Sequence, residues 1–140
     1  REKIYFNCAY FWGLGGATMA LLTPDVDFAF PNPVFFPFFW AHTLILLGVF
    51  YAVIALGERP FLKDVHKVIG VSVILMVFIY FINLLLGANF WYLMDKPEAD
   101  SLMNFFPDPP FHMAIVVPIA IVIFYLLYVP FWIKDMVSKD

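Results

Sequence analysis

The sequence predicts an all-α protein, a bundle of four helices that cross a membrane. Three observations predict this class: a high share of apolar residues, four long apolar runs, and polar breakers between the runs. Apolar residues make up 64% of the 140 positions and charged residues only 14%, which exceeds what a soluble domain can bury. A hydrocarbon core about 30 Å thick needs roughly 20 helical residues, and each run is near or above that length. We therefore expect one transmembrane domain over residues 1–140.

The four expected spans follow one another with short connections. They cover residues 4–22, 38–56, 68–94 and 113–133. Turn-forming and charged residues fill the connections, which read "TPDVDFAFPNP", "GERPFLKD" and "DKPEADSLMNFFPDPP". The first run is too long for a signal peptide and has no small-residue cleavage site. Because the chain opens with Arg1 rather than Met, we expect further spans upstream.

Basic residues predict the orientation of the bundle. With four spans, both chain ends and the 57–67 connection share one side of the membrane. That side holds seven of the eight Lys and Arg residues: Arg1, Lys3, Arg59, Lys63, Lys67, Lys134 and Lys139. The other side holds Lys96 and the carboxylates Asp25, Asp27, Asp95, Glu98, Asp100 and Asp108. By the positive-inside rule, both ends are cytoplasmic in a multi-pass protein of the cell membrane.

Small residues in the first span predict close helix packing. Gly13 with Ala17, and Gly16 with Ala20, form small-xxx-small pairs that let another helix approach. We therefore expect this helix to be central in the bundle, with other transmembrane helices or subunits packing on these four residues. The segment "GLGGATMA" looks like a phosphate loop, but no strand precedes it, so a nucleotide site is excluded. The expected partners are the lipid bilayer and these helices, and no nucleic acid.

Polar residues within the spans mark the candidate site. The rise per helical residue places His42 about 7 Å below the outer surface, with Asn83 and Asn89 in the same outer half. Ionisable and polar groups within a membrane are costly and are usually functional. Two alternatives stay open: the asparagines bond other helices, and His112 is interfacial and solvated. The full candidate set is His42, Thr43, Asn83, Asn89, His112 and the outer-turn residue Asp25.

Four motifs resemble the YwaF-like family of bacterial integral membrane proteins. They are "AYFWGLGGATMALLTPD", "FPNPVFFPFFWAH", "INLLLGANFWYLMDKP" and "YLLYVPF". Eukaryotic relatives of that family look like membrane phospholipid acyltransferases with a Cys-His pair, and the motif places its histidine at His42. The resemblance implies about seven spans, of which this chain supplies the C-terminal four. The motif that carries the family's cysteine is absent here.

Cys8 is not expected to replace that nucleophile. A thiol must come within hydrogen-bond reach of its base. Helical rise puts Cys8 roughly 22 Å before the outer turn, near the cytoplasmic end, whereas His42 lies near the outer surface. The two side chains are therefore expected to lie well apart. A motif at the start of a preceding span would instead lie in the outer layer beside His42.

Two functions stay open from the sequence. One is a lipid-modifying acyltransferase, with His42 as general base, Asn83 or Asn89 as orienting groups, and a nucleophile from outside this chain. The alternative is a non-catalytic scaffold or accessory subunit of a larger membrane complex. A haem bundle with His42 and His112 as axial ligands is the least favoured reading. We expect no cofactor and no metal.

Overall fold

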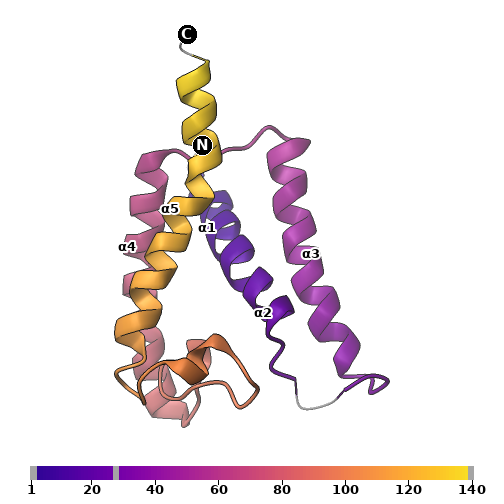
Figure 1. Ribbon diagram of the computed structural model, residues 1–140, viewed down its shortest axis with the longest axis vertical. Helices are drawn as coiled ribbons and strands as arrows, with labels where there is room; N and C mark the ends of the chain where they lie inside the picture. The colour runs from indigo at the N-terminus through magenta and orange to yellow at the C-terminus, as the bar shows by residue number, and fades with distance from the viewer. Residues whose placement is uncertain (1–2, 27–28, 139–140) are drawn as a thin grey trace.

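The computed structural model describes residues 3–26 and 29–138, and every regular element in these ranges is helical. Arg1, Asp27 and Lys139, which entered the charge count, lie outside the described residues. Figure 1 shows the arrangement of the helices. The elements in chain order are α1 (Ile4–Trp12), η1 (Gly13–Ala17), α2 (Thr18–Leu22), α3 (Phe35–Ile54), α4 (Leu62–Leu86), η2 (Phe90–Tyr92), η3 (Leu102–Phe105) and α5 (Met113–Val137).

Among the described residues, three helices are long and apolar enough to cross a membrane by length and composition: α3, α4 and α5. The first expected span is helical as well, but it changes character in the middle. Its central segment, η1, is a π-helix between the short α-helices α1 and α2. The structure thus yields three candidate spans where the sequence predicts four.

The helix expected at 68–94 is α4, and its bounds differ at both ends. It begins earlier because Oδ2 of Asp64 accepts a hydrogen bond from the Phe61 backbone N–H at 3.0 Å, which caps the first turn. It ends at Leu86 because Gly87 adopts a left-handed conformation with φ of 61°. The residues that follow form η2 and a polar loop, so the aromatic cluster there belongs to the connection.

Figure 1 places α1 between α3 on one side and the α4–α5 pair on the other. The contacts agree, since α1 packs on α3 and α4, while η1 packs on α3 and α5. The beginning of α1, the α3–α4 connection and the end of α5 lie at one end of the bundle (Figure 1). The longer connections before α3 and before α5 lie at the other end. The expected central position of the first helix is therefore confirmed.

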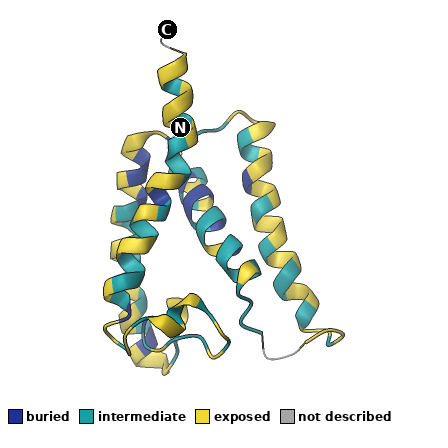
Figure 2. Ribbon diagram, in the orientation of Figure 1, coloured by how far each residue is buried: buried dark blue, intermediate teal, exposed yellow. Residues whose placement is uncertain are grey.

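The core is small and lies where α1 meets α4 and α5. Phe11, Val65 and Val68 are fully buried, and Phe124 of α5 packs against Phe11 with ring centroids 5.3 Å apart. The hydroxyl of Tyr10 donates to the Leu127 carbonyl oxygen at 2.9 Å. Figure 2 shows exposed and intermediate residues over most of α3, α4 and α5. Apolar side chains are expected on these faces when lipid covers them.

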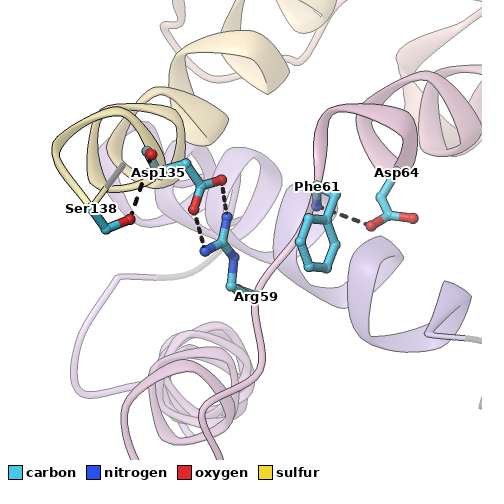
Figure 3. A network of polar contacts seen from close by, with 5 residues as sticks. All are labelled: Arg59, Phe61, Asp64, Asp135 and Ser138. Carbon is cyan, nitrogen blue, oxygen red and sulfur yellow. Dashed lines mark hydrogen bonds and ion pairs between the residues drawn. The ribbon is translucent and has the colours of Figure 1, made fainter. Parts of the chain in front are cut away.

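An ion pair ties the α3–α4 connection to the end of α5 (Figure 3). The Arg59 guanidinium donates to both carboxylate oxygens of Asp135, one of these bonds measuring 2.6 Å. It also lies over the rings of Phe61 and Phe131, 4.9 and 5.7 Å from their centroids. The hydrogen bond with Asp135 raises the pKa of the Arg59 guanidinium above its ordinary value. The planar guanidinium of Arg59 thus contacts two carboxylate oxygens and two aromatic rings. These contacts fix the end of α5 against the α3–α4 connection.

Candidate functional site

A cavity of about 790 Å³ lies between the helices and the long connection that precedes α5. Its walls come from α1, η1, α2, α3, α4 and α5, and residues of the 91–106 segment line one end of it. Most lining side chains are apolar. The polar ones are Thr23, Asp25, His42, Ser72, Tyr92 and Ser101. A largely apolar cavity with a few converging polar groups is the usual form of a small-molecule or lipid site.

His42 enters this cavity from α3, one turn after Phe38. Its Nδ1 lies 2.7 Å from the Phe38 carbonyl oxygen, and the Phe38 ring packs on the imidazole with centroids 4.4 Å apart. A carbonyl oxygen can only accept, so Nδ1 carries the hydrogen, and in the neutral ring Nε2 keeps its lone pair. Within the described ranges, Nδ1 makes the only hydrogen bond of this ring. Nε2 is therefore the nitrogen that can take a proton.

A second cavity, of about 370 Å³, also reaches His42. It lies between η1 and α3 and is lined by Ala9, Trp12, Gly13, Gly16, Ala17, His42 and Ile45. Trp12, Gly16 and His42 line both cavities. His42 thus lies where the two spaces adjoin. The indole N–H of Trp12 donates to the hydroxyl of Ser72 at 2.9 Å, which holds the shared wall against α4.

Asp25 lines the large cavity and accepts two hydrogen bonds from the connection before α5. Its Oδ2 accepts from the Tyr92 hydroxyl at 2.7 Å, and its Oδ1 accepts from the Ala99 backbone N–H at 3.1 Å. These bonds join the turn after α2 to the connection before α5. Sequence reasoning placed Asp25 in the outer site but missed Tyr92, because 67 positions separate the two residues and no local pattern links them.

A model of the TMEM164 family matches residues 1–128. The chain belongs to the TMEM164 family. No curated protein and no solved structure matches it. Membership in this family and the apolar helices α3, α4 and α5 identify an integral, multi-pass membrane protein in contact with lipid. This match does not test the resemblance to the YwaF-like family, so that relation and the activity it implies stay predictions.

In this TMEM164-family chain, Asn83 and Asn89 hold the connection before α5. The Asn83 amide accepts from the Phe90 N–H at 2.9 Å and donates to the Phe90 carbonyl oxygen at 3.0 Å. The Asn89 side chain accepts from the N–H groups of Met94 and Asp95, both at 3.0 Å. Neither residue lines the cavities at His42. Their catalytic role stays a prediction, and the contacts they make are structural, with loop backbone rather than with other helices.

His112 is fully buried, which contradicts the reading of a solvated interfacial residue. Its Nε2 lies 2.8 Å from the Tyr92 carbonyl oxygen, while Nδ1 is buried and has no hydrogen-bond partner in the part of the chain that the structure describes. The backbone of Tyr92 therefore connects to α5 while its side chain connects to Asp25. Tyr92 itself has a positive φ of 52°, a conformation that these contacts on both sides hold in place.

The glycines of the first expected span differ in their surroundings: α3 packs on Gly13, whereas Gly16 lines the large cavity. A Cβ at Gly13 would lie 3.0 Å from Cγ2 of Ile45 and 3.1 Å from Cγ2 of Val49, so α3 of this same chain packs there. Ala17 is buried, whereas a Cβ at Gly16 would meet nothing within 4 Å. The Gly13 and Ala17 face is thus already covered within the chain. Gly16 and Ala20 line the large cavity instead.

The contribution of Tyr92 to the stability of the folded protein is expected to change with pH in the alkaline range. Burial, followed by the hydrogen bond to Asp25 and the charge of Asp25, raises the pKa of Tyr92 to about 12. In the unfolded chain a tyrosine has a pKa of about 10. The stabilisation that the Tyr92 hydroxyl provides is therefore complete below that pH and is lost as the pH rises toward about 12. We expect the advantage in melting temperature of the wild type over Tyr92→Phe to shrink across this window.

The measurement is thermal unfolding of the detergent-solubilised protein at a series of pH values. Tyr5→Phe is the matched control, because Tyr5 is 85% exposed. Its difference from the wild type is expected to stay constant over the same window. An advantage over Tyr92→Phe that does not change with pH would contradict the assignment.

Proposed function

We propose that this chain is the His-bearing part of a lipid-modifying acyltransferase, and that His42 is its general base. The observation that carries the proposal concerns the imidazole: His42 lines both cavities, Nδ1 is bonded to the Phe38 carbonyl oxygen, and within the described residues Nε2 makes no hydrogen bond. A general base needs a lone pair that can take a proton, and the neutral imidazole has one at Nε2. The motif resemblance supports the same residue.

The proposed reaction divides acyl transfer into two steps. Nε2 of His42 takes the proton of a thiol supplied by a segment before residue 1, as the sulfur attacks the ester carbonyl of a phospholipid. The ester C–O bond breaks, the lysophospholipid oxygen takes the proton back from His42, and an acyl thioester remains. In the second step, His42 takes the proton from the hydroxyl of an acceptor lysophospholipid as the hydroxyl oxygen attacks the thioester carbonyl. The C–S bond breaks, and the sulfur takes the proton back from His42, which restores the thiol. Each step is balanced in protons without any cofactor.

The cavity fits this chemistry in size and in polarity. A volume of about 790 Å³ lies in the upper part of the range for ligand sites. Phe11, Met19, Met76, Val116 and other apolar side chains line its depth, while Asp25 and Tyr92 lie at its outer end. Acyl chains would lie against the apolar walls, with the ester near His42. Within the described ranges, neither cavity has a lining cysteine, and Cys8 packs at the edge of the core instead.

The proposal includes four spans, with both ends cytoplasmic. The continuous helical path from α1 through η1 to α2 supports a fourth crossing, and the distribution of basic residues supports the orientation. In a background where Cys8 and every other cysteine of the complete protein are replaced by serine, Phe105→Cys is expected to react with a membrane-impermeant maleimide on intact cells. Val137→Cys is expected to react only after permeabilisation. Both sites are well exposed, at 86% and 71%. The reverse pattern would overturn the orientation.

The test of the function is an acyl-exchange assay with the complete protein in lipid vesicles. The vesicles carry a phospholipid with a deuterated acyl chain and an unlabelled lysophospholipid acceptor. We expect the label to appear in newly made phospholipid, as measured by mass spectrometry. If the folded, complete protein transfers no label, the enzyme reading is overturned and the scaffold reading is favoured.

A further inference from the structure

We infer that Gly16 is a specificity-determining residue, and that its missing side chain lets an acyl chain extend past His42 from the large cavity into the small one. The inference rests on the proposed function, because it assigns an acyl chain to the cavities. It adds a residue that neither the motif resemblance nor the general-base assignment involves. The observations that carry it are the shared walls of the two cavities and the empty space at Gly16.

The two cavities have three lining residues in common, and these come from two facing elements. Trp12 and Gly16 lie on the helix of the first span, one turn apart, and His42 lies on α3. Trp12 is held by its hydrogen bond to Ser72, and the His42 ring is held by Phe38. Gly16 is therefore the member of the shared wall whose side chain can be enlarged without breaking a hydrogen bond.

The surroundings of Gly16 differ from those of its neighbours in η1. A Cβ at Gly16 meets nothing within 4 Å, whereas one at Gly13 lies within 3.1 Å of two α3 side chains, and one at Gly15 makes ordinary contacts with α5. Gly16 also has helical backbone angles, so a larger residue there requires no strained conformation. Ile45 and Val49 of α3 pack against Gly13, whereas Gly16 is exposed and a Cβ there would meet no atom of the described residues within 4 Å. The cavity is what a side chain at this position would fill.

The backbone of this wall has a second unusual feature. Gly13–Ala17 form a π-helix inside a span that is α-helical before and after it. Single π turns within α-helices are rare and occur often at functional sites. Here the π turn lies opposite His42 and carries lining residues of both cavities. A widened turn with a glycine on its open side leaves room for a chain to pass between η1 and α3.

The test measures how chain length affects binding. The complete protein in nanodiscs is titrated with saturated fatty acids from octanoic to eicosanoic acid, which displace cis-parinaric acid. The signal is energy transfer to this probe from the protein's tryptophans, with empty nanodiscs as background. In the wild type, affinity is expected to rise along the series, since each buried methylene adds to binding.

Gly16→Leu is expected to shorten the accepted chain. Octanoic acid should bind within about twofold of wild type, while eicosanoic acid should bind at least about tenfold more weakly, because displacing two methylenes already costs about that factor. Gly16→Ala is expected to give a smaller shift in the same direction. Gly48→Leu and Gly70→Leu are matched controls, because a Cβ at either position meets nothing within 4 Å and neither residue lines a cavity. Both should bind the series as the wild type does.

Two results would overturn the inference: a wild-type series for Gly16→Leu, or equal weakening of short and long acids. If Gly16→Leu does not fold, a series for Gly16→Ala identical to the wild type has the same meaning. The binding assay needs no turnover, so it separates the two proposals. An inactive protein with the expected shift would refute only the acyltransferase, and an active protein with an unshifted series would refute only the role of Gly16.

Discussion

Replacing His42 by alanine in the complete protein is expected to lower acyl transfer by about 10²- to 10⁴-fold. The imidazole of His42 lines both cavities, so its loss removes the proposed proton acceptor. The fold should survive the change. Within the described residues, the ring makes one hydrogen bond, to the Phe38 carbonyl oxygen of its own helix, and the backbone hydrogen bonds of α3 do not depend on it.

His42→Asn distinguishes the loss of the proton acceptor from the loss of the hydrogen bond to Phe38. An asparagine amide can still donate to the Phe38 carbonyl oxygen, yet it cannot accept a proton near neutral pH. We expect this variant to be as inactive as His42→Ala. The label-transfer rate of both is compared with that of His66→Ala, which removes an exposed imidazole on α4 that lines neither cavity. Turnover at the wild-type rate by folded His42→Ala would refute the general-base role.

Replacing Asn83 by leucine is expected to destabilise the protein by about 2–4 kcal/mol. The Asn83 amide is 1% exposed and satisfies both the N–H and the carbonyl of Phe90. Leucine leaves these two backbone groups without their partner and releases the connection that closes the large cavity. A lower melting temperature of the detergent-solubilised protein, followed by tryptophan fluorescence, is the expected readout.

Asn83→Asp gives an intermediate case. A carboxylate still accepts from the Phe90 N–H but cannot donate to its carbonyl oxygen. Asn104→Leu serves as the control, since Asn104 is exposed in η3 and, within the described residues, its side chain bonds only Asp100. Its melting temperature should stay near that of the wild type. If Asn83→Leu has the same melting temperature as the wild type, Asn83 does not hold the connection before α5, and a catalytic role for it gains support.

Much of the fold could be predicted because the signals for it are local. An apolar run of about 20 residues is a helix in a membrane wherever it lies in the chain, and this signal found α3, α4 and α5. The end of α4 was placed too late because the apolar run continues through Phe90, Trp91 and Tyr92 after the helix stops at Gly87. Hydropathy does not distinguish a span from an aromatic connection that follows it directly.

Depth in the membrane, taken from helical rise, predicts only in part which residues lie together in the candidate site. Helical rise correctly grouped His42 with Asp25, which line the same cavity. It also grouped them with Asn83, Asn89 and His112, whose side chains bond loop backbone instead. Residues at one depth can point in different directions, and the direction depends on which helices pack together. The partners of Tyr92 and His112 were therefore beyond sequence reasoning.

The sequence by itself determined the class, the membrane, and the residues that can carry chemistry, because these depend on composition and on the length of apolar runs. Only the tertiary structure decided what each of these residues does. Gly13 and Gly16 are the same residue three positions apart, yet α3 side chains pack closely on the first, whereas the large cavity adjoins the second. The physical reason is that close packing and open space both arise from side chains distant in sequence, such as Ile45 and Val49, which no local pattern specifies.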